Sequence, residues 1–371
     1  MTYVRSERGI ALPLAIFALV VIGGMVAGSF FIATQEQSVG RNSVRFQQAF
    51  AAAEEGAQAT VANWSSTVYN TLNNGDSVSI GGVLDSRTGW YRGSVRRLSD
   101  LLFLVRSEGF NRDSTARQQV GIVVRLRPLE ITINSALKTQ GDTRIGGSSF
   151  ISGNDHLPGS WTGCPALNSA LPGIRIDPAG SITTSGCSSL ECVEGSPKVE
   201  VDETINDSTL TTFGDAEFDD LLGLATIIVT GGNMKIQPVV SGAACVTSTL
   251  TNWGSPLDPT GACGDYFPII WVEGDLSING DQGQGVLVVN GSLSVQGGFE
   301  FFGPVIVRNS LKTTGTGGHF NGGVIAANVD LEQNTVLGDA VVNYSSCAVL
   351  RALTASASGD LLRERSWINL Y

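Results

Sequence analysis

The residues whose types could do chemistry in this chain are the carboxylates of its C-terminal third. Cleavage of a glycan needs carboxylates, or carboxylates with Arg or Lys, gathered on one face. The candidates lie among short β-branched runs: Asp275, Asp281, Glu300, Asp330 and Glu332. They do not recur at matching positions of these runs, and Asp at a corner between strands commonly forms the turn itself. Their spacing therefore does not predict an acid–base pair.

The histidine and glycine patterns do not indicate a catalytic or metal site either. His156 and His319 each lie among Gly and polar residues, a pattern typical of surface loops. No Cys-x-x-Cys pair and no His spacing suited to zinc is present. The Gly-rich run 315–318 lacks the Lys-Ser/Thr ending of a phosphate-binding loop. We predict that the chain is not an enzyme and needs no cofactor or metal.

The cysteines are better explained as bridges than as nucleophiles. All six follow the apolar N-terminal stretch: Cys164, Cys187, Cys192, Cys245, Cys263 and Cys347. An even number in an exported segment suggests disulfides, and six cysteines allow about fifteen connectivities. Closeness in sequence favours Cys187–Cys192 and Cys245–Cys263, which leaves Cys164 and Cys347.

The charge balance argues against nucleic acid as a partner. The net charge is −11, and only 15% of residues are charged. The one basic cluster is Arg87, Arg92, Arg96 and Arg97, which we interpret as a solvated face. A nucleic-acid binder would carry a basic stripe.

These residues must be positioned by a chain whose N-terminal part contains an uncharged stretch, from Ile10 to about Thr34. At 1.5 Å per residue this stretch can span a hydrocarbon core of ~30 Å. A secretory signal peptide has a shorter apolar run and then a cleaved loop, whereas here the helical pattern continues through Ala57. Two interpretations remain: a plain single-span anchor, or a prepilin-type leader cut between Gly9 and Ile10 that leaves the helix on the mature protein.

Residues 5–64 resemble the N-terminal region of type IV pilin-like proteins, in particular the PilX-type minor pilins. The resemblance lies in Arg8-Gly9 before an aliphatic run and in the Ala/Glu-rich segment 50–59. It implies cleavage by prepilin peptidase after a leader of residues 1–9, and a helix in inner-membrane lipid. It also implies a periplasmic or extracellular body and assembly with other pilin-like subunits through the helix.

One departure from the family pattern bears on the role. Most pilins carry Glu at the fifth mature position, implied to pair with the terminal amine of a neighbour, and here that position is Leu14. The difference favours a minor, initiating or tip-located subunit over a major repeating one. Pro13 fits the cleaved form, because the first four helical N–H groups have no intrahelical partner.

The next segments predict a helix over 10–66 and a small antiparallel β unit over 67–130. One apolar stripe should bury against the sheet: Phe46, Phe50, Ala53, Ala57, Val61 and Trp64. Gly23, Gly24 and Gly28 weaken the helix locally; they are candidate points of loosening during assembly, or contacts with a neighbouring helix. Four β runs bounded by Gly, Asn and Asp supply the sheet: 77–80, 89–92, 101–105 and 120–126.

From about residue 131 the texture changes to short β pieces separated by Gly, Asn or Asp. Residues 269–350 align with themselves at a step of roughly 17–19 residues, each unit being two short strands broken by an Asn/Gly corner. The repeats begin at Ile269, Val286, Pro304, Gly323 and Ala340. Such units bury their apolar faces only by stacking, so we predict a parallel β-helix domain over 131–350, with insertions at about 155–175 and 195–265. A short amphipathic helix is expected over 213–222.

The remaining residues, 351–371, are expected to form a tail, partly helical from Gly359, that caps the last coil with Trp367 and Tyr371.

Taken together, the predicted fold class is a membrane-anchored α+β protein with a pilin-type helix, a small antiparallel sheet and a parallel β-helix. The predicted function is that of a minor pilin or pseudopilin displaying the β-helix towards a surface ligand or partner. The alternatives are a membrane-anchored envelope protein that is structural or binds glycan, and a carbohydrate-active enzyme on an anchor.

Overall fold

The computed structural model describes residues 11–84, 89–214, 216–328, 334–362 and 367–369. Its contacts divide the chain into two units. The first contains the described residues of Met1–Asn63, Gly75–Val124 and Leu361–Tyr371. The second contains Trp64–Asn74 and Arg125–Asp360. Each unit is described by itself below.

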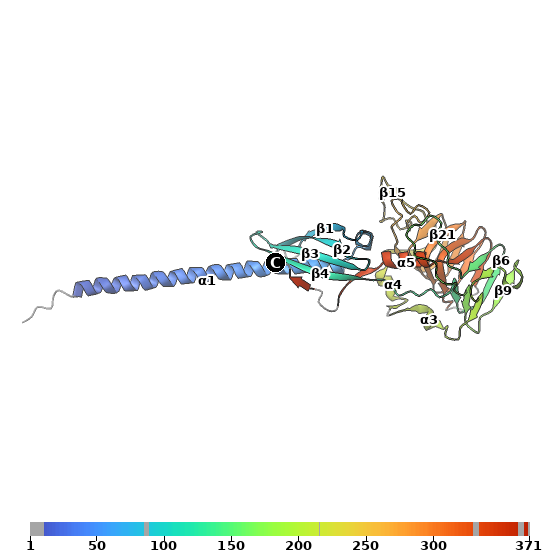
Figure 1. Ribbon diagram of the computed structural model, residues 1–371, viewed down its shortest axis with the longest axis horizontal. Coiled ribbons are helices and arrows are strands. Elements are labelled where there is room, and N and C mark those ends of the chain that lie inside the picture. Colours follow the sequence, from blue (N-terminus) through green and yellow to red (C-terminus); the bar gives the residue numbers. More distant parts are fainter. Residues whose placement is uncertain (1–10, 85–88, 215, 329–333, 363–366, 370–371) are drawn as a thin grey trace, which may run out of the picture. The chain divides into compact units, whose positions relative to one another are not determined.

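The first unit is built on one long helix, α1 (Ala11–Ala62), drawn in blue in Figure 1. Its 52 residues extend for about 78 Å at 1.5 Å per residue. No proline interrupts it after Pro13. At its end the Asn63 side-chain amide donates to the Ala59 carbonyl at 2.9 Å, and the helix ends four residues earlier than the predicted 66.

An antiparallel sheet completes the first unit. Its strands are β1 (Ser77–Val83), β2 (Gly89–Arg97), β3 (Leu102–Asn111) and β4 (Arg117–Arg127), in that spatial order. Each prediction of a strand here is confirmed, and all four strands are longer than predicted.

The C-terminal tail differs from its prediction. The segment after Gly359 belongs to a strand, β26 (Ser358–Leu361), where a helix was expected. The next described strand, β27 (Trp367–Asn369), pairs antiparallel with β4, placing Trp367 opposite Ile122. The expected capping of the last coil by Trp367 is therefore wrong: backbone pairing to an open strand edge draws this strand into the antiparallel sheet. Tyr371 lies outside the described residues.

The second unit is a curled, mainly parallel sheet of 17 strands. Its pairings form three ladders, which we name A, B and C. Ladder A has the spatial order β14 (Ile227–Met234), β17 (Ile269–Asn279), β19 (Val286–Asn290), β21 (Phe299–Val307), β23 (Gly318–Ala326), β5 (Leu137–Thr139), β8 (Ile174–Ile176), β11 (Val199–Val201).

Ladders B and C run beside it in the same axial direction. After the second halves of β14 and β17, ladder B continues with β20 (Leu293–Gln296), β22 (Leu311–Thr313), β24 (Asn334–Val336), β6 (Thr143–Gly146) and β9 (Ile182–Ser185). Ladder C contains β18 (Gln282–Gln284), the first halves of β21 and β23, β25 (Val341–Tyr344), β7 (Phe150–Ser152) and β10 (Val193–Glu194). A coil thus has three strand segments, one more than the sequence predicted.

The coil corners explain why a third segment escaped notice. β21 and β23 each pass from ladder C to ladder A without a break in strand character. Gly303 (φ +131°) and Gly322 (φ +151°) make these corners, in a backbone region that residues with a Cβ rarely adopt. At Gly303 a Cβ would also overlap the carbonyl oxygen of Gly285 on the adjacent coil. The corner therefore requires glycine.

The coils do not stack in the order of the chain. The chain enters at β5 in the middle of ladder A, moves outward to β11, and then returns to the far end at β14. From β14 it moves inward coil by coil until β23 pairs with β5, with Val324 opposite Leu137. Both blocks advance in one axial direction, so the solenoid is a circular permutation of a sequential one.

The repeat prediction is confirmed for four of its five units. Ile269 lies opposite Val286, and the registers of the next strands place Val286 beside Pro304 and Pro304 beside Gly323. The predicted place of the fifth unit is wrong. Residues 341–344 pair with 319–322 of ladder C, because the place beside Val324 is taken by the first coil of the chain.

The return connection, residues 202–226, was predicted to hold one amphipathic helix. It holds two short ones, α3 (Asp207–Thr211) and α4 (Asp220–Leu224), with a small antiparallel pair between them. Gly214, at φ +63°, breaks the helix that the apolar spacing suggested. We call residues 202–226 the strap.

Candidate assembly helix and display surface

The N-terminal part of α1 is uncovered. Every described side chain from Leu12 to Gln48 is exposed, although the helix is apolar as far as Ile32. An 18-residue window of it has a mean hydropathy of 2.4 and no buried residue. By length and composition this helix could cross a membrane. A surface of this size and polarity requires another apolar environment.

The covered part of α1 buries small residues, which corrects the predicted stripe. Ala49, Ala52, Ala53 and Ala57 are fully buried, whereas Phe46 and Phe50 are 54% and 39% exposed. Ala53 and Ala57 of the predicted stripe are therefore confirmed as buried, whereas the expected burial of Phe46 and Phe50 is wrong. Small residues let the helix backbone come close to the sheet, and the aromatic rings lie outside that contact.

Glycines on the sheet and helix set this close approach. Gly109 of β3 lies directly against the α1 backbone, where a Cβ would overlap atoms of Ala49, Ala52 and Ala53. On the helix side, Gly56 lies under the ring of Tyr91, which leaves no space for a Cβ. The helix is therefore held tightly to the sheet from Ala49 onward. By contrast, nothing in the described part of the chain lies within 4 Å of a Cβ built at Gly23, Gly24 or Gly28. Packing within the chain therefore does not explain why these positions are glycine.

In the second unit, the outer side of ladder A is covered by the chain's own segments. Its outward side chains include Trp271, Val288, Ile306 and Ile325, all nearly or fully buried. They form one cluster with apolar residues of the strap and of α5 (Ser346–Ala355). This side is therefore not available to a ligand.

The end of ladder A formed by β8 and β11 carries charged side chains. The Arg175 guanidinium binds Glu200 at 2.7 Å and Asp202 at 3.2 Å. Hydrogen bonds from the Thr204 hydroxyl and backbone N–H lower the pKa of Asp202, with a smaller contribution from Arg175. Burial lowers the pKa of Lys138, which Asp202 partly offsets. This network fixes the point at which the strap leaves ladder A.

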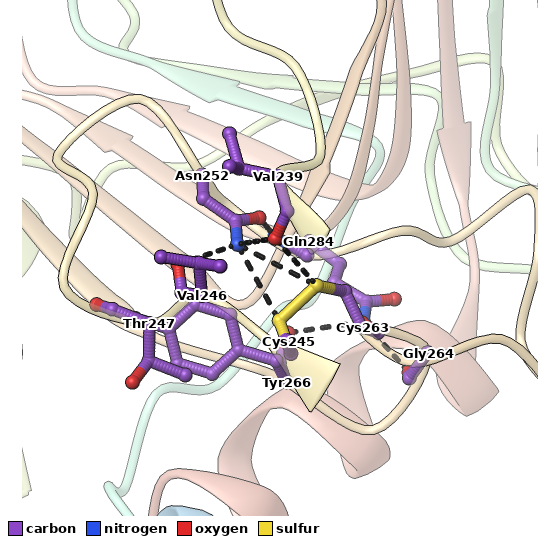
Figure 2. The surroundings of a disulfide bond; sticks show 10 residues. Val239, Cys245, Val246, Thr247, Asn252, Cys263, Gly264, Tyr266 and Gln284 are labelled. Carbon is purple, nitrogen blue, oxygen red and sulfur yellow. Dashed lines mark hydrogen bonds between the residues drawn. A yellow bond between two sulfur atoms is a disulfide. The ribbon is translucent and has the colours of Figure 1, made fainter. Parts of the chain in front are cut away.

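Residues 239–266, which we call the cap, close the core at the β18 end of ladder C (Figure 2). Cys245 and Cys263 are joined there, and Asn252 donates from its amide to the Val239 and Val246 carbonyls at 3.0 and 2.9 Å. The cap adds a fully buried side chain, Trp253, to the core.

A buried glutamine anchors the same cap to the sheet. The Gln284 amide nitrogen donates to the carbonyls of Cys263, Gly264 and Tyr266 at 3.2, 2.7 and 3.0 Å. Burial raises the pKa of Tyr266 to about 12, so its hydroxyl stays protonated. These contacts form a structural plug for the solenoid end.

Ladder B presents a polar outer side. One outward position of seven paired strands is polar throughout: Asn233, Ser277, Ser294, Lys312, Thr335, Arg144 and Thr183. All seven are exposed or half-buried. At the β14 end a hollow of about 670 Å³ adjoins this row, and its lining includes Lys235, Asn279, Asp281 and Gln296. This row and the hollow beside it form a polar surface on the second unit.

The predicted site residues are placed as follows. Gly9 and Ile10 lie outside the described residues. Cys187 is joined to Cys192 and Cys245 to Cys263, the pairs that closeness in sequence favoured. Cys164 is joined to Cys347, which ties the loop after β7 to α5.

The carboxylates and histidines weighed for catalysis do not converge in the described part of the chain. Asp275 accepts a hydrogen bond from the Ser292 backbone at 2.7 Å, a corner role. His319 lies 3.9 Å from Glu300 and contacts the Asp339 carbonyl, whereas His156 contacts the Ser152 hydroxyl. Asp330 and Glu332 lie outside the described residues.

Sequence analysis missed several of the residues that hold each unit together. The small-residue face of α1 was visible as Ala and Gly at steps of three and four between Ala49 and Gly56, but apolar size drew attention to the phenylalanines. Nothing local in the sequence indicated that Asn70 would donate to three backbone carbonyls at the end of α5.

No family model matches the chain, and no curated protein matches it. Among solved structures, the crystal structure of competence-associated pilin ComZ from Thermus thermophilus is similar at 12% identity and a TM-score of 0.23. The match covers 86% of this chain and 96% of that chain. At this TM-score the similarity is too low to assign a fold or a function, so the proposal below depends on features of the chain itself.

Proposed function

We propose that the chain is a subunit of a type IV pilus or a related secretion filament. In this function α1 anchors the subunit in the inner membrane and later packs with other pilin-like subunits. The second unit stands outside the membrane and displays its solenoid. Leu14, in place of the family's Glu, favours a minor or tip-located subunit.

The observation that carries the proposal is the division of α1 into an uncovered part, residues 12–48, and a part held by a sheet from Ala49 onward. A plain anchor needs only a membrane span of about 20 residues. Here the same helix continues without a break from the apolar part to the small-residue contact at Ala49–Ala57. A single rigid rod is what a subunit requires if its helix is to pack against other helices while its sheet stays outside.

The leader supports the same function. Arg8-Gly9 precedes the apolar run, and prepilin peptidase would cut between Gly9 and Ile10. The mature helix would then start close to the first described residue of α1, Ala11. Pro13 would fall in the first helical turn, where its missing N–H costs nothing.

The display surface of the second unit is the polar outer side of ladder B. Hydroxyl, amide and basic side chains there recur at the strand spacing, about 4.8 Å, and the strap covers the alternative side on ladder A. A polar surface ligand, such as a glycan, suits these groups. Of the described carboxylates weighed for catalysis, Asp275 accepts a hydrogen bond at a coil corner, and we propose binding and not catalysis.

The second candidate is an envelope protein that uses α1 only as an anchor. The observation favouring it is that the apolar half of α1 is by itself sufficient to span a bilayer. The two candidates differ in whether the chain leaves the membrane with a filament.

Gly9→Leu tests the proposal in cells that contain prepilin peptidase. We expect the variant to keep its leader, to run at a higher mass and to be absent from the sheared filament fraction. Gly40→Ala, in the exposed middle of α1, is the matched control and should be processed normally. Unchanged processing of Gly9→Leu would overturn the proposal, and a processed chain never found with filaments would favour the anchor alone.

A further inference from the structure

The hollow at the β14 end of ladder B is lined by polar side chains that the chain does not use for its own contacts. Its volume of about 670 Å³ lies within the ~300–1,000 Å³ typical of small-ligand sites. The lining includes Asn233, Lys235, Ser277, Asn279 and Gln296. In the part of the chain that the structure describes, none of these five side chains forms a hydrogen bond or an ion pair with another residue.

On ladder A, by contrast, comparable side chains bind one another from coil to coil. The Asn290 amide donates to Glu273 at 3.0 Å, and Arg308 donates to Asn290 at 2.9 Å. Asn279 and Gln296 on ladder B are also opposite each other in the strand register, yet their amides form no such bond. Both side chains are exposed, so their donors and acceptors are available to a ligand.

The strand register places these groups on one side of the sheet. Ser277 and Asn279 are two residues apart on β17, so both point outward. Asn233 of β14 lies opposite Ser277, and Gln296 of β20 lies opposite Asn279. Lys235 lies two residues beyond Asn233 and lines the same hollow. Neighbouring strands are about 4.8 Å apart, so an elongated ligand would meet a new polar group at each coil.

The chemistry of these groups matches a sugar. Amide and hydroxyl side chains both donate and accept hydrogen bonds, as the hydroxyls of a sugar do. Met234, half-buried at the hollow, offers an apolar patch to the C–H face of a sugar ring. Lys235 and Asp281 both line the hollow without forming an ion pair. The Asp281 carboxylate can therefore accept from sugar hydroxyls, and the Lys235 ammonium is left for an anionic group of the ligand.

We propose that this hollow binds a short acidic oligosaccharide, one that carries a carboxylate as a uronic acid does. The carboxylate lies against the Lys235 ammonium, and neighbouring hydroxyls are held by the Asn279 and Gln296 amides. The inference rests on the proposed display function, because it names the ligand class and the site for the surface that ladder B displays.

Charge along ladder B favours an acidic ligand over a neutral one. The outward row that starts at Asn233 includes Lys312 and Arg144 and contains no carboxylate, although the chain as a whole has a net charge of −11. A nucleic acid suits the hollow less well. Single strands are bound largely by stacking of bases on aromatic rings, and none of the described residues that line the hollow is aromatic.

Glycan binding by the detergent-solubilised full chain tests the site. An array of uronate-containing oligosaccharides of defined structure, each beside its carboxyl-reduced counterpart, identifies a bound member. Calorimetry with that oligosaccharide then gives the dissociation constant. We expect at least one acidic oligosaccharide to bind. Its carboxyl-reduced form should bind at least about tenfold more weakly, because the charge-assisted hydrogen bond to Lys235 is lost.

Four exposed positions supply the variants. Lys235→Ala should weaken binding at least about tenfold, and Asn279→Ala and Gln296→Ala about threefold or more each. Arg144→Ala is the matched control. It removes the same charge from ladder B at a place five strands away in the register, about 24 Å, beyond the reach of a short oligosaccharide in the hollow. It should leave the affinity within about twofold.

Three results would overturn the site: no acidic oligosaccharide bound, equal binding of the carboxyl-reduced form, or equal losses of affinity in Lys235→Ala and Arg144→Ala. A single-stranded DNA oligonucleotide that binds with the same dependence on Lys235 would overturn the ligand class.

These outcomes are separable from failure of the proposed filament function. Binding is measured on the purified chain, whereas Gly9→Leu and the sheared fraction report assembly. A chain that enters filaments but binds no acidic oligosaccharide would contradict this inference alone. A chain that binds the oligosaccharide but never enters filaments would support the site and contradict the filament.

Discussion

Gly109 of β3 lies against the backbone of α1 at Ala53, so closely that a side chain on Gly109 would overlap the Ala53 nitrogen. This contact joins the strand to the helix at the point where α1 changes from uncovered to buried. It therefore fixes how much of the helix stands clear of the sheet.

Replacing Gly109 by Ala should loosen this contact. Overpacking of a tight site costs about 1–3 kcal/mol, and here the overlapping atoms are helix backbone, which cannot rotate away. Amide hydrogen exchange in β3 of the detergent-solubilised full chain should become faster. Gly40→Ala, with open space at its Cβ, should instead stabilise α1 by about 1 kcal/mol; slower exchange in Gly109→Ala would contradict the close approach.

The two disulfides Cys164–Cys347 and Cys187–Cys192 should differ in their effect on the stability of the second unit. The first closes a sequence separation of 183 residues and the second one of 5. If loop closure in the unfolded chain dominates, C164S/C347S should lose about 3 kcal/mol more than C187S/C192S. Denaturant unfolding of the two double variants gives the comparison. Equal losses of unfolding free energy would contradict a dominant contribution from loop closure in the unfolded chain.

Asn70 should be essential to the end of α5. Its amide nitrogen donates to the carbonyls of Thr354, Ala355 and Ala357 at 3.3, 2.9 and 2.8 Å. Asn70→Asp keeps the size but replaces the donor by an acceptor facing three carbonyls, and should cost about 1–3 kcal/mol. Thr67→Ala, an exposed change nearby, is the control. Unfolding midpoints of the second unit that agree within error for both variants would contradict the role of Asn70.

The ion-pair network of Arg175, Glu200 and Asp202, where the strap leaves ladder A, should make the stability of the second unit sensitive to acid. The pKa of Asp202 is lowered by Thr204 and Arg175, so its contribution to stability is present above the unfolded value of 3.8 and is lost as the pH falls through the lower folded value. Unfolding free energy measured between about pH 2 and 6 should therefore fall less steeply in Asp202→Asn. Thr204→Val, which removes the hydroxyl donor, should shift the pKa of Asp202 upward and flatten the curve in part. Curves parallel to that of the unaltered chain would exclude this contribution.

The repeat register was predictable because each coil repeats a β-branched run and an Asn or Gly corner at nearly constant spacing. Ile269, Val286 and Pro304 thus align in the sequence as they do in the sheet. The coil order was not predictable. Leu137 lies beside Val324, and nothing in the local pattern of either residue distinguishes this partner from the next repeat.

The extent of α1 and part of its buried side were predictable, since Ala53 and Ala57 of the expected stripe are buried whereas Phe46 and Phe50 are not. Apolar composition set the start and length of α1, whereas the buried side depends on how near the sheet can come. The distance between helix and sheet is set by Gly109 of β3 and Tyr91 of β2, which are far from the helix in the sequence. The strap was half predicted: the apolar spacing of Phe213, Phe218 and Leu221 identified a buried face, but Gly214 divides the segment into two helices.

The most direct test of the proposed filament function is the mass of the mature N-terminal peptide, isolated from membranes of the native host. Cleavage by prepilin peptidase predicts a chain that begins at Ile10, with a methylated terminal amine. A chain that begins at Met1, or one recovered mainly in soluble form at full length, would contradict it.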